Sequence, residues 1–256
     1  MAWVKQRQLP LYKAMSFRGQ LCNDLDSLWG ALDGTYNAAN GTSVDLGILD
    51  AVLLLPEREW QPFSMIELTQ ALHVCSSTLA PGPDHVTWGM LKHITANPHI
   101  TKLVLGLVEA CLMVGHWLTH FKESLSVIIP KPGKPSYLTP KSFHLIILLN
   151  TLGKLIKKIL SQQLQFEGVH YGAFQPNQFG GISQRSTEDV GVFITHLTRA
   201  GWAKKLKTSV VAFDIVQFFL SLNHEVLMVV IVKAGFPPVV GNFFWSYLTG
   251  HKTMYK

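Results

Sequence analysis

Asp214 is the carboxylate whose surroundings in the sequence best suit chemistry. It ends the β-branched and apolar run that begins at Thr208, and this run predicts a buried strand. A carboxylate at a strand end is a suitable ligand for a divalent cation, because Mg²⁺ prefers oxygen ligands held in fixed positions. Taken alone, an aspartate in this place is more often a cap for a turn or a helix.

Two aromatic residues follow Asp214 within five positions, namely Phe218 and Phe219. A planar side chain there can lie beneath the sugar of an incoming nucleotide and exclude a 2′-hydroxyl. Ordinary core packing is the alternative, and one of the two phenylalanines is expected to have that role.

Lys131 and Lys134 lie on a proline-rich turn, Pro130 to Pro135, between two apolar runs at 125–129 and 143–149. The pattern predicts a hairpin whose stiff tip carries two cations. Such a tip suits a triphosphate or a template backbone, although a solvated hairpin tip has the same composition.

A glycine-containing loop carries a further group of polar residues. Its small residues allow a backbone or a base to approach closely, and its arginine can meet a phosphate beside a helix N-terminus. A tight turn that enters a capped helix is the alternative, and both interpretations can hold together. The residues concerned are Gln178, Gly180, Gly181 and Arg185.

Helices and strands alternate along the chain and position these residues, a pattern typical of an α/β or α+β enzyme. Residues 1 to about 62 have irregular patterning and suggest a connecting region with short helices rather than a packed domain. Capping residues and apolar spacing predict helices from Ser64, Thr87, Ile100, Thr151, Ser186, Glu225 and Val239.

The composition suits a globular protein with a polyanionic partner. The 256 residues carry a formal charge of +6, and 48% of them are hydrophobic. The three cysteines lie far apart and suggest free thiols in a reducing compartment. The sequence has no pattern of a signal peptide or a membrane span, so we expect an intracellular protein without membrane contact.

Five blocks, in this order, resemble the reverse transcriptases of non-LTR (LINE-type) retrotransposons, with fungal elements as the expected nearest group. The resemblance covers about residues 64–252. The blocks are Ser77 to Trp88, Val127 to Pro135, Leu148 to Lys154, Gln178 to Thr187, and the segment around Asp214.

This resemblance implies an α+β right-hand polymerase fold. Residues 1–62 would form an N-terminal extension or linker, 63–205 the fingers, and 206–256 the start of the palm. It further implies an RNA template, a DNA primer, dNTP and two Mg²⁺ ions, with Asp214 as a catalytic metal ligand. Nucleotide contacts fall on Lys131, Lys134, His144, Phe218 and Phe219, and template or primer contacts on Gln178, Gly180, Gly181 and Arg185.

The chain also departs from the family pattern. His144-Leu145-Ile146 replaces an Arg-Pro-Ile core, and Leu220 stands where a proline is common. The downstream Tyr/Phe-x-Asp-Asp hairpin is missing, and two-metal transfer needs more than one carboxylate. We therefore expect fingers and a partial palm that are inactive alone and need a complementary C-terminal portion. A non-catalytic RNA-binding remnant and an inert pseudogene product are the alternatives.

Overall fold

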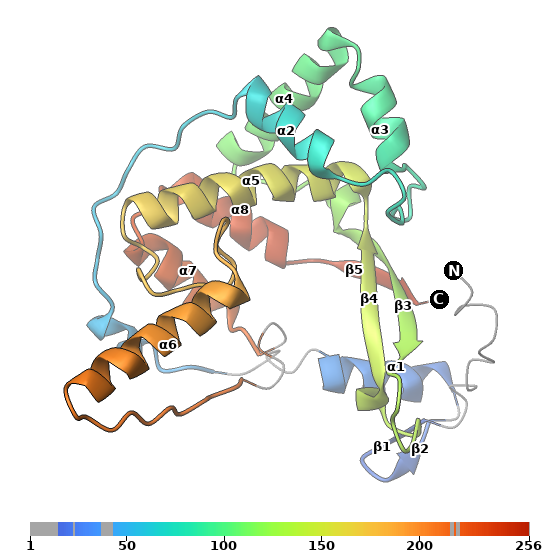
Figure 1. The fold of residues 1–256 in the computed structure, drawn as a ribbon. Coiled ribbons are helices and arrows are strands. Elements are labelled where there is room, and N and C mark those ends of the chain that lie inside the picture. Colours follow the sequence, from blue (N-terminus) through green and yellow to red (C-terminus); the bar gives the residue numbers. More distant parts are fainter. Residues whose placement is uncertain (1–14, 23, 37–42, 216–217, 219–220, 256) are drawn as a thin grey trace.

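The computed structural model describes residues 15–22, 24–36, 43–215, 218 and 221–255. Figure 1 shows a small sheet, a block of helices around α5, and an N-terminal part beside the hairpin. In chain order the elements are β1 (Ser16–Phe17), β2 (Gln20–Leu21), α1 (Leu25–Tyr36), η3 (Leu46–Ala51), α2 (Met65–Val74), α3 (Trp88–Ile94), α4 (Pro98–Met113), η4 (Thr119–Lys122), β3 (Glu123–Pro130), η5 (Pro140–Ser142), β4 (Phe143–Leu149), α5 (Thr151–His170), α6 (Thr187–Ala203), α7 (His224–Lys233), α8 (Pro238–Leu248) and β5 (Lys252–Tyr255).

The predicted hairpin is confirmed: β3 and β4 pair antiparallel with Ile128 opposite Leu145. Its turn passes through Gly133 with a positive φ of 74°, a backbone conformation that glycine adopts without steric cost. β5 pairs with the other edge of β3 in parallel, which gives the order β4-β3-β5. The sequence contained no signal for β5.

α5 lies at the centre of the helical block (Figure 1). Its predicted apolar stripe is confirmed, because Leu155, Ile156, Ile159 and Leu160 are all buried. Each such side chain contributes about 1.5–3 kcal/mol when it is removed from water. They join one core with side chains of α2, α3, α4, α7 and α8. The fully buried Trp117 also belongs to this core.

The N-terminal part is more ordered than the sequence indicated. α1 packs on the hairpin, where Leu32 and Phe143 form a second small core with Met15. The Tyr36 hydroxyl lies 2.9 Å from the carbonyl oxygens of Pro140 and Phe143. The interpretation of this stretch as a connecting region therefore missed its packing, which depends on contacts with residues more than a hundred positions away.

Residues 52–63 form a strap, defined here as the extended segment between η3 and α2. It runs along the turn between α7 and α8, where the Leu55 amide donates to the Lys233 carbonyl at 2.8 Å. Gly235 has a φ of +75°, and a Cβ there would lie 2.3 Å from the Pro56 carbonyl oxygen. The strap thus packs too closely for any side chain larger than glycine at this turn.

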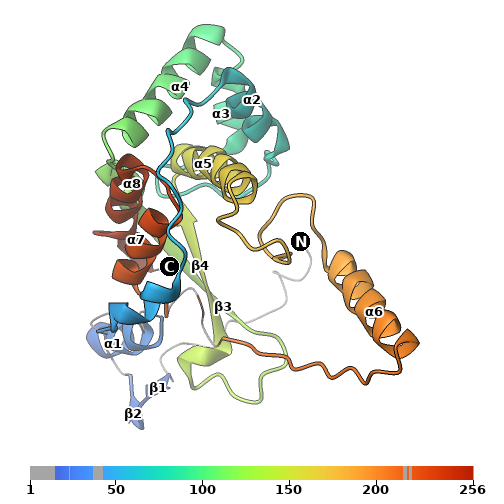
Figure 2. The ribbon, with the colours of Figure 1, turned by 90° about the vertical axis from the view of Figure 1, so that its left-hand side faces the viewer.

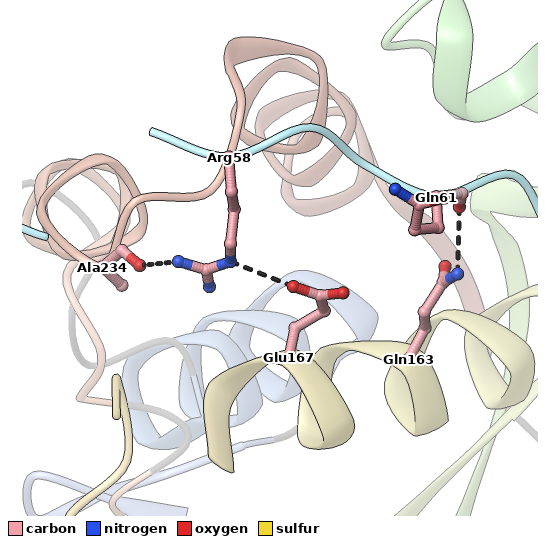
Figure 3. Close-up of polar contacts among 5 residues, drawn as sticks. All are labelled: Arg58, Gln61, Gln163, Glu167 and Ala234. Carbon is pink, nitrogen blue, oxygen red and sulfur yellow. Dashed lines mark hydrogen bonds and ion pairs between the residues drawn. The ribbon is translucent and has the colours of Figure 1, made fainter. Parts of the chain in front are cut away.

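Arg58 of the strap joins three parts of the chain (Figure 3). Its Nε lies 3.0 Å from Glu167 Oε2 of α5, and its Nη1 donates to the Ala234 carbonyl at 2.6 Å. The guanidinium also lies 4.3 Å from the ring centroid of Phe236. Because both charged side chains are at most 10% exposed, this pair is a buried ion pair.

The predicted strand from Thr208 to Asp214 does not form. Residues 206–215 are extended and exposed, without a strand assignment. A strand needs hydrogen bonds from a neighbouring strand, and in the described parts of the chain this segment has none beside it. β-propensity alone was therefore an insufficient basis for the prediction.

Gly82 packs against the start of α5 and provides a test of the fold. A Cβ at this position would lie 2.5 Å from backbone atoms of Leu149 and Asn150, which cannot move aside easily. Gly82→Ala should lower the free energy of unfolding by about 1–3 kcal/mol in urea denaturation. Gly106→Ala on α4 is the matched control, because its Cβ would meet nothing within 4 Å. Equal effects of the two substitutions would contradict this packing.

Candidate nucleic-acid and nucleotide site

Asp214 lies in the extended segment between α6 and α7, and its side chain is exposed. In Figure 2 this segment runs apart from the helical block. Among the described residues, no group of three or more His, Cys, Asp or Glu side chains could hold a metal ion. One exposed carboxylate supplies a single ligand and does not fit a two-metal site.

The structure describes one of the two phenylalanines that follow Asp214. Phe218 is 48% exposed, so its ring is not fully packed in the core. Phe219 lies outside the described residues. Neither the nucleotide-contact role nor the packing role predicted for this pair is tested by the structure.

The hairpin brings three predicted nucleotide contacts to one end of the sheet. His144 pairs with Ile129, two residues before Lys131. The Lys131 ammonium donates to the Lys141 carbonyl at 2.8 Å, which ties it to the turn. Lys134 at the tip is exposed. The three side chains thus share one end of the hairpin and present cationic or titratable groups there.

The loop of residues 171–186 is held by its own arginine. Arg185 Nη1 donates to the Pro176 carbonyl at 2.8 Å and also to the Gln178 carbonyl. Its guanidinium lies 5.9 Å from the Phe179 ring centroid. Gly181 has a φ of +74° and Gly180 is exposed. Arg185 therefore has the structural role of closing a turn, while its charge stays at the surface.

The capping residues predicted at the starts of α2 and α6 are confirmed, and the structure shows a capping box at each. The Ser186 side chain accepts from the Asp189 amide, and the Asp189 carboxylate accepts from the Ser186 amide. These hydrogen bonds hold the pKa of Asp189 below its usual value. The same reciprocal pattern joins Ser64 and Glu67 at the start of α2. Asp189 is thus a capping residue of α6.

The sequence block Ser77 to Trp88 contacts the block Leu148 to Lys154, and the sequence did not indicate this contact. Asn150, which is fully buried, donates to the His120 carbonyl at 2.9 Å and accepts from the Asp84 amide at 3.3 Å. The Lys154 ammonium donates to the Ala80 carbonyl at 2.9 Å. Burial lowers the pKa of Lys154, and the nearby Asp84 partly opposes this. Residues 80–84 are therefore bound to the start of α5.

Asp84 stabilises a turn before α3. Its Oδ1 accepts from the Val86 amide at 3.2 Å, which closes a short turn. The polar side chains of Asn150 and Lys154 were visible in the sequence, but their partners lie about 30 to 74 positions away. Only the fold could reveal that they fix this turn.

Comparison with known proteins identifies the family. Residues 129–256, half of the chain, match the reverse transcriptase (RNA-dependent DNA polymerase) family. The chain belongs to this family. The match includes the hairpin lysines, the loop of Gln178 to Arg185, and Asp214, so four of the five sequence blocks lie wholly or partly inside it.

Two curated relatives agree with the reverse transcriptase match. The chain is 29% identical over 198 residues to the "Probable RNA-directed DNA polymerase from transposon BS" of Drosophila melanogaster, covering 77% of this chain and 21% of the relative. It is 24% identical over 165 residues to the "Retrovirus-related Pol polyprotein from type-1 retrotransposable element R1" of Bradysia coprophila, covering 64% and 16%. The chain thus spans about a fifth of the length of these relatives.

The resemblance to non-LTR retrotransposon polymerases is therefore supported at the level of family and descent. The mixed α and β content agrees with a reverse transcriptase domain. Among the helices in the described part of this reverse transcriptase, none has the length and hydropathy to cross a membrane.

Proposed function

We propose that this chain is the fingers region and the start of the palm of an RNA-directed DNA polymerase. In this proposal residues 63–205 form the fingers, residues 206–256 begin the palm, and residues 1–62 are an N-terminal extension. The polymerase extends a DNA primer on an RNA template by two-metal nucleotidyl transfer. The family match over residues 129–256 carries the proposal, because it includes the Asp214 segment. The closeness to fungal elements stays a prediction.

Asp214 is proposed as one Mg²⁺ ligand, and the other carboxylates come from a complementary C-terminal polymerase portion. The exposed apolar side chains next to Asp214 support this. Val211 is 71% exposed and Phe213 is 91% exposed, although both are of a type that packs in sheets. α6 has no buried residue and leaves Trp202 65% exposed. Large apolar side chains exposed within one segment are typical of a protein interface.

The hairpin end and the loop are proposed as nucleotide and template contacts. Lys131, Lys134 and His144 would face the incoming dNTP, with Phe218 or Phe219 beneath its sugar. Gln178, Gly180, Gly181 and Arg185 would lie along the template or primer. Because the His144 side chain is shorter than arginine and lacks its planar fork of donors, contact with the triphosphate there is expected to be weak.

A non-catalytic RNA-binding role is the second candidate, and one observation favours it. The basic run Lys204, Lys205 and Lys207 is exposed at the end of α6. Exposed lysines that neutralise phosphates bind nucleic acid without any need for a metal site. This role and the polymerase role share the RNA contacts and differ only in whether dNTP is incorporated.

Both candidates predict RNA binding that is sensitive to salt. For about three phosphate contacts on a single strand, the affinity should fall roughly tenfold or more between 50 and 200 mM salt. The logarithm of the binding constant falls linearly with the logarithm of the salt concentration. Lys131→Gln with Lys134→Gln should make this slope shallower by about 0.7 per lost phosphate contact. Fluorescence anisotropy with a single-stranded RNA measures both effects.

A matched control removes the same charge elsewhere. Lys92→Gln with Lys102→Gln changes two lysines of α3 and α4, which are outside the proposed site. This double variant should leave the slope of the binding constant against salt concentration unchanged. RNA affinity that does not respond to salt, or equal effects of the two double variants, would refute the proposed contacts.

A further inference from the structure

A row of side chains on α5 ends in three exposed residues, Gln162, Phe166 and His170, beyond the part of the helix that carries the apolar stripe. Lys158, Gln162, Phe166 and His170 follow one another at intervals of four residues, so each lies beside the next along the helix surface. The row is roughly 18 Å long at 1.5 Å per residue. It combines a cation, an amide and two rings, which together can contact phosphates and bases.

Phe166 and His170 form an aromatic platform in this row. Their ring centroids are 5.5 Å apart and their planes differ by only 9°, so the rings stack. Phe166 is 64% exposed. Tyr171 meets the His170 ring edge-on at 4.7 Å, which restrains the imidazole. Exposed aromatic faces of this kind bind nucleic-acid bases by stacking.

A hollow of about 470 Å³ lies between this platform and the loop that follows α5. Gln165 Oε1 accepts from the Ser183 amide at 3.0 Å and from the Ser183 hydroxyl at 2.7 Å, which fixes the loop beside the helix. Gln162 and Gln184 line the hollow with exposed amides. An amide both donates and accepts, so it can pair with the polar edge of a base.

The charge around the hollow favours a polyanion. The lining residues include Arg185 and contain neither aspartate nor glutamate. Glu167 is the sole acidic residue of α5, and it is buried against Arg58 on another face of the helix (Figure 3). The ion pair therefore removes the one negative charge that would otherwise repel phosphates from this helix.

We propose that this surface, named here the α5 ledge, binds unpaired nucleotides of an RNA strand. The ledge consists of Gln162, Phe166, His170, Gln184 and Arg185. A base stacks on Phe166, the two glutamines contact base edges, and Arg185 meets a phosphate. The inference rests on the proposed function and adds a base-stacking contact to it. A protein segment that covered the ledge would instead have to supply polar or acidic partners for Gln162, Gln184 and Arg185.

The test compares base stacking with phosphate binding in the 256-residue chain. The probes are a fluorescent oligoadenylate RNA and an abasic ribose-phosphate chain of the same length, measured by fluorescence anisotropy at one salt concentration. Phe166→Ala should weaken oligoadenylate binding at least about fivefold and leave abasic binding unchanged. Phe166→Trp should retain the affinity. Leu103→Ala on α4 is the control, since this side chain is 69% exposed and lies outside the ledge.

The outcomes separate this inference from the proposed function. Salt-sensitive RNA binding that Phe166→Ala leaves unchanged would overturn the ledge and keep the proposed function. An equal loss of affinity for the oligoadenylate and the abasic chain in Phe166→Ala would also overturn the ledge and keep the proposed function. A chain that binds neither probe would contradict the RNA contacts of the proposed function and the ledge with them. His170→Ala, which removes the second ring, should weaken oligoadenylate binding by a smaller factor, and thermal unfolding by circular dichroism verifies that each variant is folded.

Discussion

Replacing Arg58 with alanine is expected to lower the free energy of unfolding by about 3–5 kcal/mol. The substitution leaves the Glu167 carboxylate buried at 7% exposure without its ion-pair partner. It also removes the hydrogen bond to the Ala234 carbonyl, so the strap, α5 and the α7–α8 turn lose their common contact. Urea denaturation followed by circular dichroism measures the effect.

Two further variants distinguish the buried ion pair from a general loss of arginine. Arg199→Ala on α6 removes an exposed arginine and should change the free energy of unfolding by less than about 0.5 kcal/mol. Replacing Arg58 and Glu167 together with methionine should recover most of the loss, because no buried charge then lacks a partner. A loss below about 1 kcal/mol for Arg58→Ala would show that the strap does not depend on this contact.

Replacing Asp214 with asparagine is expected to abolish DNA synthesis in a polypeptide that continues this chain through a Tyr/Phe-x-Asp-Asp hairpin. The amide keeps the shape of the side chain but lacks the charge that a divalent cation requires. The loss should be at least about a hundredfold, since even groups that only support metal ligands contribute about 10- to 100-fold. Primer extension on an RNA template measures it.

Asp189→Asn is the matched control for this substitution. Asp189 lies in the same family match, but its carboxylate caps α6 through Ser186. Its replacement should therefore reduce stability slightly and leave primer extension within a few-fold of the unchanged polypeptide. Equal loss of synthesis in both variants would contradict the assignment of Asp214 as the metal ligand.

Features coded by neighbouring residues were predictable from the sequence. The stripe of α5 consists of residues up to four positions apart, and the capping boxes at Ser64 and Ser186 need only residues three apart. The hairpin follows from two apolar runs around a proline-rich turn. In each case the pattern and its structural partner lie within the same short segment, so local physics decides the outcome.

Features that depend on distant partners were not predictable. Arg58 meets Ala234 across 176 positions, and no periodicity of the strap indicates this contact. The segment before Asp214 has the composition of a strand but no neighbouring strand in the described part of the chain. For the candidate site, the residue types were evident, whereas the structural use of Arg185 and the burial of Asn150 required the fold.

Primer extension by the 256-residue chain alone tests the central claim most directly. The claim is that this reverse transcriptase segment binds RNA and carries one carboxylate of an active site that another polypeptide portion completes. With an RNA template, a DNA primer, dNTP and Mg²⁺, the chain should bind the template-primer and incorporate no nucleotide. Incorporation that disappears in Asp214→Ala would contradict the claim, because it would show a complete active site within these residues.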